Sequence, residues 1–468
     1  MSTEKETAAA QNRMGTAKML PLILTMALPA MFSMLIQALY NIVDSYFVAQ
    51  LSQNALTAVS LAFPIQNLLV AFGVGTGVGV GSLISRRLGE RDQRAANNAA
   101  THGVILAIIT WVIFAIAGAA TARPFVSLYT KDAEVLEMGE TYLIIVTVVS
   151  FGFFVSSCVE KMLQATGSMI VPMIIQLVGA VTNIILDPIM IYGLIGFPKL
   201  GVAGAAIATV IGQILSMVVG LLFLFLGKHA VSIGLKGFRF HGKTIRDIYI
   251  VGVPSIVMNA IGTVMTMAMN GILAAFSAAA VNVFGVYFKL QSFVFMPVFG
   301  LTQGLMPIMG YNYGARNKSR VTSALRMGII IALIINVLGT ICFELFPSAL
   351  IGIFNATDEL LRIGDPALRI IAVHFPIAAV GITMSTLFQA TGKGVYSLIQ
   401  SLMRQLVVLV PAAWLLAKIN LDAVWFSFPI AEVASLIVTI VFFIRLYNQE
   451  IRHLGERQVG SERLESMV

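Results

Sequence analysis

The tetrapeptide Gln-Ala-Thr-Gly at 164–167 recurs in full at 389–392. Other identities at the same offset are Pro29 with Pro254, Gly75 with Gly300, Gly89 with Gly314 and Arg91 with Arg316. Single matches between apolar segments can arise by chance, whereas a four-residue match in the same register is much less expected. The sequence therefore predicts an internal tandem repeat.

The composition places this repeat in a membrane. Of 468 residues, 58% are hydrophobic and 11% charged, and the mean hydropathy is +0.90. Water-soluble domains carry about a quarter charged residues, so a soluble protein is excluded. Twelve apolar blocks are long enough to cross a bilayer: 19–48, 55–84, 97–120, 139–160, 168–193, 201–226, 246–272, 279–309, 322–343, 363–387, 396–417 and 423–446.

The distribution of basic residues predicts the orientation. If both termini are cytoplasmic, the inside loops and tails hold 23 of the 30 Lys and Arg residues. Such a bias is typical of the cytoplasmic side of a bacterial inner-membrane protein. It also accounts for the net charge of +8 without a nucleic-acid partner. Residues 1–18 are polar, and the apolar block that follows is too long for the core of a signal peptide.

The repeat and the twelve blocks together predict an all-α polytopic membrane protein of two six-helix halves. Because six is even, both halves run in the same direction, as parallel repeats do. The expected parts are a cytoplasmic tail at 1–18, an N-lobe at 19–227, a cytoplasmic linker at 228–245, a C-lobe at 246–447 and a second tail at 448–468. Two parallel lobes with a cavity between them are the usual architecture of a secondary transporter. Because no phosphate-binding loop of ATPases is present, transport would draw on an ion gradient.

Pro29 and Pro254 occupy equivalent places in the first helix of each half. Each proline removes one backbone hydrogen bond of its helix. The result is either a static kink or a hinge that moves during transport. The glycines at alternate positions from 73 to 81 resemble a nucleotide loop only superficially, since they lie inside an apolar block and favour close helix packing.

Four polar residues of the N-lobe are predicted to form a cation site. Asp44, Asp187 and Thr209 lie at similar depths in their helices, and Asn183 is one turn from Asp187 on the same face. Carboxylate, amide and hydroxyl oxygens suit a hard cation such as Na⁺. The two carboxylates could instead share a proton. The alternative is that these are separate polar residues that stabilise helix packing.

The C-lobe lacks this set but has its own charged residues. Lys289 and Glu432 each lie about ten residues from the expected outer face, and His374 lies at a similar depth. A charge within the bilayer is costly, so an ion pair between Lys289 and Glu432 is expected. That pair, with His374, would be either structural or part of a proton or substrate path.

The chain resembles the multidrug and toxic compound extrusion (MATE) family from about residue 19 to 447. The motifs that carry the resemblance are Asn-Ile-Val-Asp at 41–44, Gln-Ala-Thr-Gly at 164–167, Asn-Ile-Ile-Leu-Asp-Pro at 183–188, the small-residue segment at 201–209 and Gly-Tyr-Asn-Tyr-Gly-Ala-Arg-Asn at 310–317. The pattern is similar to that of the bacterial MepA-like and DinF-like members. Another branch carries an acid in helix 7, where this chain has Gly262.

The resemblance implies an antiporter, not an enzyme, that exports small organic and often cationic compounds by alternating access between its lobes. It implies coupling to H⁺ or Na⁺ at Asp44, Asn183, Asp187 and Thr209, with no cofactor and a monomeric state. A flippase for lipid-linked or polyprenyl precursors is the alternative within the wider superfamily. A channel or a membrane receptor is the alternative from other classes.

Overall fold

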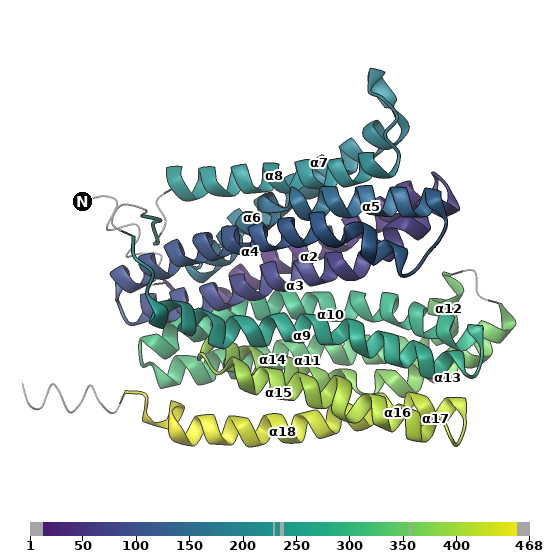
Figure 1. The fold of residues 1–468 in the computed structure, drawn as a ribbon. Coiled ribbons are helices and arrows are strands. Elements are labelled where there is room, and N and C mark those ends of the chain that lie inside the picture. The colour runs from purple at the N-terminus through teal and green to yellow at the C-terminus, as the bar shows by residue number, and fades with distance from the viewer. Residues whose placement is uncertain (1–12, 228–229, 235–237, 355–356, 456–468) are drawn as a thin grey trace, which may run out of the picture. The chain divides into compact units, whose positions relative to one another are not determined.

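The computed structural model describes residues 13–227, 230–234, 238–354 and 357–455, and at 41, 42, 44, 45 and 49 it describes the backbone only. Their regular secondary structure is helical, and the described residues include no β-strand (Figure 1). By length and composition, ten helices among the described residues can span a membrane. Two bent helix pairs bring the number of spans among the described residues to as many as twelve. The predicted all-α polytopic fold is confirmed.

The chain divides into two compact units, and the first consists mainly of Phe32–Ile256. Its helices are the second part of α2 (Met19–Ala49), then α3 (Gln53–Gly89), α4 (Gln93–Ser127), α5 (Ala133–Val148), α6 (Phe151–Ala165), α7 (Ile170–Tyr192), the short η1 (Leu194–Gly196), α8 (Val202–Leu226) and the first part of α9 (Gly242–Ala274). A buried apolar cluster that includes Val48, Tyr142 and Ala205 connects α2, α5 and α8 at one end of this unit.

The second unit comprises Met14–Met31 and the chain from Val257 onward. Its helices are the first part of α2, the second part of α9, then α10 (Ala278–Gly314), α11 (Lys318–Leu345), α12 (Pro347–Gly352), α13 (Asp358–Ala372), α14 (Phe375–Ala390), α15 (Gly394–Leu402), the π-helical η2 (Met403–Leu409), α16 (Val410–Leu416), α17 (Leu421–Trp425), α18 (Ser427–Gln449) and η3 (Ile451–His453).

The unit boundaries differ from the predicted lobe boundaries at two equivalent places. They fall within α2, between Met31 and Phe32, and within α9, between Ile256 and Val257. Both boundaries follow a proline by two residues, and their separation in the chain equals the offset of the repeat. Each of these helices therefore contributes one part to each unit. The predicted tails and linker lie partly outside the described residues.

Local structure repeats at the same offset as the sequence. After α6, Gly167 has a φ of 88°, and after α14, Gly392 has a φ of 82°. Glycine adopts this left-handed conformation without steric cost, which explains why both copies of Gln-Ala-Thr-Gly end a helix with glycine. In both copies the glycine N–H donates to the glutamine carbonyl, at 3.0 and 3.1 Å.

The helix beginnings repeat as well. Ser52 caps α3 by accepting a hydrogen bond from the N–H of Ala55 at 3.0 Å, and Ser277 caps α10 in the same way from Ala280 at 3.1 Å. Arg91 and Arg316 both have positive φ, 60° and 57°, at the turn after the second helix of each half. The predicted repeat is thus present in the backbone as well as in the sequence.

The fourth predicted helix of each half is bent instead of straight. α5 and α6 meet at 44°, and α13 and α14 meet at 48°. The sequence predicted single helices at 139–160 and 363–387, because apolar composition continues across both breaks. His374 lies at the second break, where its backbone N–H donates to the carbonyl of Ile371 at 3.0 Å in a tight turn.

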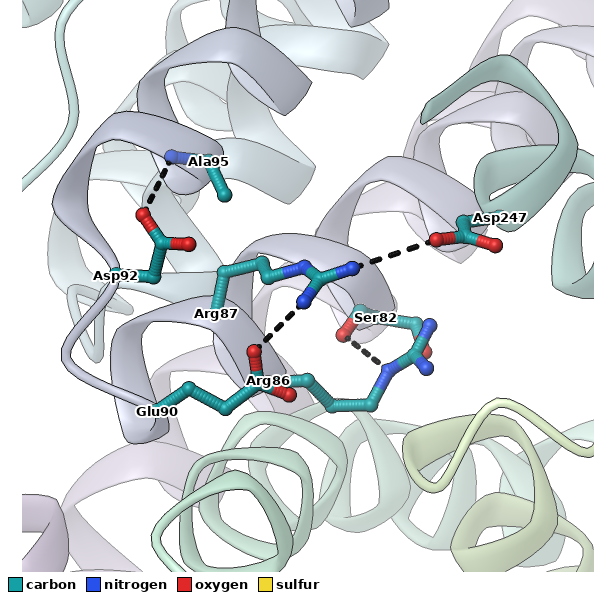
Figure 2. A network of polar contacts seen from close by, with 7 residues as sticks. All are labelled: Ser82, Arg86, Arg87, Glu90, Asp92, Ala95 and Asp247. Carbon is teal, nitrogen blue, oxygen red and sulfur yellow. Dashed lines mark hydrogen bonds and ion pairs between the residues drawn. The ribbon is translucent and has the colours of Figure 1, made fainter. Parts of the chain in front are cut away.

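Polar contacts at the end of α3 link it to α9 within the first unit, and Asp92 beside them caps α4 (Figure 2). Arg87 donates to Glu90 at 2.8 Å and to Asp247 of α9 at 3.4 Å. Asp92 caps α4 by accepting from the N–H of Ala95 at 2.9 Å. The guanidinium of Arg87 therefore connects the end of α3 to the part of α9 that belongs to this unit.

Candidate functional site

Helices α7 and α8 lie side by side and carry three of the four predicted cation-site residues (Figure 1). A row of small side chains at four-residue intervals allows this close approach: Gly204, Ala208, Gly212, Ser216 and Gly220. A Cβ on Gly212 would lie 2.8 Å from the carbonyl oxygen of Gly179, so the two backbones nearly touch. The hydroxyl of Ser216 donates to the carbonyl of Ile175 at 3.0 Å.

Asn183, Asp187 and Thr209 meet in the interior of the first unit. Their exposed fractions are 2%, 0% and 7%. With its amide nitrogen turned toward the carboxylate, Asn183 donates to Asp187 Oδ2 at 2.9 Å. Its oxygen then accepts from the hydroxyl of Thr209 at 3.2 Å and from the backbone N–H of Thr209 at 3.1 Å. This orientation is assigned because the opposite one would point the amide oxygen at the carboxylate.

Asp44 lies in α2, but its side chain is outside the described part of the structure. The residues that follow it do pack near the end of α7. The hydroxyl of Tyr192 donates to the carbonyl of Phe47 at 2.9 Å, and Val48 and Ile191 belong to the same buried apolar cluster. The meeting of Asp44 with Asp187 stays a prediction, and this contact between α2 and α7 is consistent with it.

The two predicted hinge prolines lie inside continuous helices, Pro29 in α2 and Pro254 in α9. Each is two residues before the place where its helix passes from one unit to the other. A missing backbone hydrogen bond at that place makes bending less costly there than elsewhere in the helix. Bending of either helix at its proline during transport stays a prediction.

In the second unit, the expected ion pair between Lys289 and Glu432 does not form. Glu432 is 3% exposed, and its Oε1 lies 3.9 Å from Nη1 of Arg404. The ammonium of Lys289 lies 5.6 Å from the centre of the Phe354 ring. Depth along the helices was similar for Lys289 and Glu432, but depth alone does not determine which helix faces meet.

His374, the third member of the predicted C-lobe network, is buried at the break between α13 and α14. Its Nδ1–H donates to the carbonyl of Ile371 at 2.6 Å, since a carbonyl can only accept. Its ring stacks between Phe295 and Phe428, with centroids at 6.2 and 6.0 Å. These contacts support a packing role for its ring.

Arg404 is the site residue that sequence reasoning missed. Arg404 is one of the 23 Lys and Arg residues that the sequence analysis placed on the cytoplasmic side, although it lies inside the apolar block 396–417. In the structure it occupies η2, a π-helical stretch within the span Gly394–Leu416. Pro411 follows and cannot donate to the turn before it, which favours a widened turn there. The signal available in the sequence was Arg404 itself, a single arginine that precedes Pro411 inside an apolar block.

Comparison with known proteins identifies the family. The MatE family model matches twice, at residues 29–189 and 254–415. "Multidrug export protein MepA" of Staphylococcus haemolyticus is 27% identical over 424 residues, which cover 90% of this chain and 92% of that protein.

Two solved structures are similar over nearly their full length. An outward-facing multidrug resistance MATE family transporter of the MOP superfamily is 28% identical, with a TM-score of 0.86, over 93% of this chain and 96% of the other. A MOP superfamily transporter from Pyrococcus furiosus, described as having a binding pocket of reverse polarity, is 26% identical, with a TM-score of 0.87, over 94% and 98%. The two matches of the family model begin at Pro29 and Pro254 and together cover more than half of the sequence, so this chain belongs to the MatE family of multidrug export transporters.

Proposed function

We propose that this transporter is a secondary antiporter that exports small organic, often cationic compounds in exchange for H⁺ or Na⁺. The proposed coupling residues are Asp44, Asn183, Asp187 and Thr209 of the first unit. The proposed setting is a bacterial inner membrane, with both termini in the cytoplasm and a monomeric protein. Export of several drugs is the activity named for the MepA relative, which supports the substrate class.

The observation that carries this proposal is the burial of Asp187. Its side chain is 0% exposed within α7, a helix long and apolar enough to span the membrane. An ionised carboxylate in such a place is costly, and ionisable residues there most often serve transport. The hydrogen bond from Asn183 stabilises the charged form, whereas burial favours a bound cation or proton.

Mutually exclusive binding of the ion and the substrate would couple ion entry to substrate export. An antiporter must release its substrate when the ion binds, because simultaneous binding of both would not exchange one for the other. If the ion-free state binds substrate more tightly, substrate must weaken ion binding by the same factor. Pro29 and Pro254 are proposed as the hinges through which this change reaches the first helix of each half.

The orientation of Asn183 bears on the identity of the ion. Its NH₂ group faces Asp187, and its oxygen is already accepting from Thr209. A proton can bind Asp187 without disturbing this arrangement. A sodium ion at Asp187 would require the amide to turn, so that an oxygen replaces the donor.

The test is export from proteoliposomes that carry a proton gradient or a sodium gradient, but not both. Asp187→Asn and Asp44→Asn are each expected to abolish gradient-driven export, while substrate binding measured in detergent persists. Asp422→Asn is the matched control, because Asp422 is exposed in the first turn of α17. Export at the wild-type rate by both site variants would refute the proposed coupling site.

A further inference from the structure

The second unit contains a buried cluster of polar side chains from four helical segments. We refer to Tyr287 of α10, Gln400 of α15, Arg404 of η2 and Glu432 of α18 as the C-lobe polar cluster. Tyr287 is 0% exposed, and Gln400 and Glu432 are each 3% exposed. The side chain of Arg404 is 26% exposed, so protein does not fully enclose it.

Polar atoms of this cluster lack the partners that buried groups normally have. Among the described residues, the hydroxyl of Tyr287 and Oε1 of Gln400 make no hydrogen bond. The 3.9 Å separation between Arg404 and Glu432 is an ion pair but is too long for a hydrogen bond. A buried carboxylate that relies on one long ion pair is incompletely compensated.

Two members of the cluster, Gln400 and Glu432, both approach Gly381 of α14. A Cβ at Gly381 would lie 3.0 Å from Nε2 of Gln400 and 3.6 Å from Oε1 of Glu432. The glycine therefore leaves room for the carboxylate and the amide to share one small space. The ring of Tyr287 packs against Phe428 of α18, with ring centroids 5.5 Å apart, and Phe428 is four residues before Glu432 on the same helix. The widened helical turn at Arg404 is a feature often found at functional sites.

The chemistry of the cluster favours a proton over a metal cation as its ligand. A metal ion bound to Glu432 would be repelled by the nearby guanidinium, and the two like charges would sit in a medium of low polarity. A proton instead forms an O–H bond with the carboxylate and leaves a neutral acid. The O–H of that acid is a donor within a cluster whose two acceptors without partners among the described residues are Oε1 of Gln400 and the oxygen of Tyr287.

We propose that Glu432 is a second proton-binding site of the transport cycle, separate from the site around Asp187. A proton from the aqueous phase forms the O–H bond, and Arg404 keeps its charge while the ion pair loosens. When the proton leaves, Arg404 again balances the carboxylate. This inference rests on the proposed antiport function.

The experiment measures protons released when purified protein in detergent binds ethidium, in weak buffer with a pH-sensitive dye. Wild-type protein should release protons when ethidium binds. The Glu432→Gln variant should release up to one proton fewer per protein molecule. The Asp187→Asn variant should also release fewer protons, because it lacks the other proposed site. Glu344→Gln is the matched control, because Glu344 also lies 3.9 Å from an arginine, Arg369, but is 37% exposed. That control should release the wild-type number.

The outcomes separate the two proposals. If Glu432→Gln releases as many protons as wild type while Asp187→Asn releases fewer, Glu432 is structural and only the second site is refuted. Wild-type export driven by Na⁺ without proton release would also refute the second site and retain antiport. No proton release and no gradient-driven export would refute both.

A second variant keeps the test valid if Glu432→Gln does not fold. Tyr287→Phe preserves the ring and removes only the hydroxyl, so it should shift the pH at which half of the Glu432 proton is released. An unchanged midpoint in this variant would count against the cluster as a proton site.

Discussion

Gly79 of α3 packs directly on the backbone of α9 at Gly252: a Cβ at Gly79 would lie 3.0 Å from the nitrogen of Gly252 and still closer to the carbonyl oxygen of Ile248. The second unit contains the equivalent contact, between the repeat counterparts of these two glycines. There a Cβ at Gly304 of α10 would lie 2.9 Å from the nitrogen of Ala27 in α2. Gly79 therefore allows α3 to pack closely against the first part of α9, and Gly304 allows α10 to pack closely against the first part of α2.

Gly304→Ala should therefore destabilise the protein by about 1–3 kcal/mol, because the added methyl group meets backbone that has no room to move. Gly285→Ala on the same helix is the control, since nothing lies within 4 Å of its Cβ position. That control should be neutral or slightly stabilising, because alanine favours helix. Thermal unfolding of the two purified variants compares them, and equal melting temperatures would contradict the prediction.

The pair of Arg87 with Asp247 should contribute a measurable coupling energy of about 0.5–1 kcal/mol. Both side chains are about a quarter exposed, at 28% and 24%. The cycle uses Arg87→Gln, Asp247→Asn and the double variant, with the melting temperature measured at low and high salt. The coupling should fall at high salt, because salt screens charges at the surface.

Glu90→Gln is the control for that cycle. Glu90 also pairs with Arg87, at 2.8 Å, but is 41% exposed and on the same helix end. Its coupling with Arg87 should be smaller, at about 0.3 kcal/mol. A larger coupling for Glu90 than for Asp247 would mean that Asp247 does not hold α9 to α3.

Thr209→Val should weaken gradient-driven export without abolishing it. The change removes the hydroxyl that donates to Asn183, whereas the backbone N–H of residue 209 still donates at 3.1 Å. The expected loss of stability is about 1 kcal/mol. Thr121→Val is the control, because the exposed hydroxyl of Thr121 bonds within its own helix, to Ala117. Initial export rates normalised to membrane expression distinguish the two variants.

Arg404→Gln should destabilise the protein by about 1–3 kcal/mol, because it removes the counter-charge of the buried carboxylate of Glu432, which a bound proton replaces only in part. Adding Glu432→Gln should recover most of that loss. Lys289→Gln should cost no more than about 0.5 kcal/mol, since Lys289 is exposed and lies over the face of Phe354. Additive effects of the Arg404 and Glu432 substitutions in thermal unfolding would argue against the pair.

The sequence alone determined the class of this protein, its repeat and part of its site. Composition excluded a soluble fold, and the constant offset of the repeat located equivalent helix ends such as those after Gln164 and Gln389. These features are local: a left-handed glycine ends a helix wherever it occurs, and residues four apart share a face. The four-residue spacing on one helix therefore predicted correctly that Asn183 lies beside Asp187.

Only the tertiary structure decided which helices meet and through which faces. Glu432 pairs with Arg404 and not with Lys289 because the rotation of α10, η2 and α18 about their axes sets the contact, and depth along a helix carries no information on rotation. The positions of the unit boundaries within α2 and α9 also could not be predicted from the sequence. A membrane helix is apolar on every side, so hydrophobic pattern does not identify its packing partner, and close contact of small residues such as Gly79 and Gly304 makes that choice.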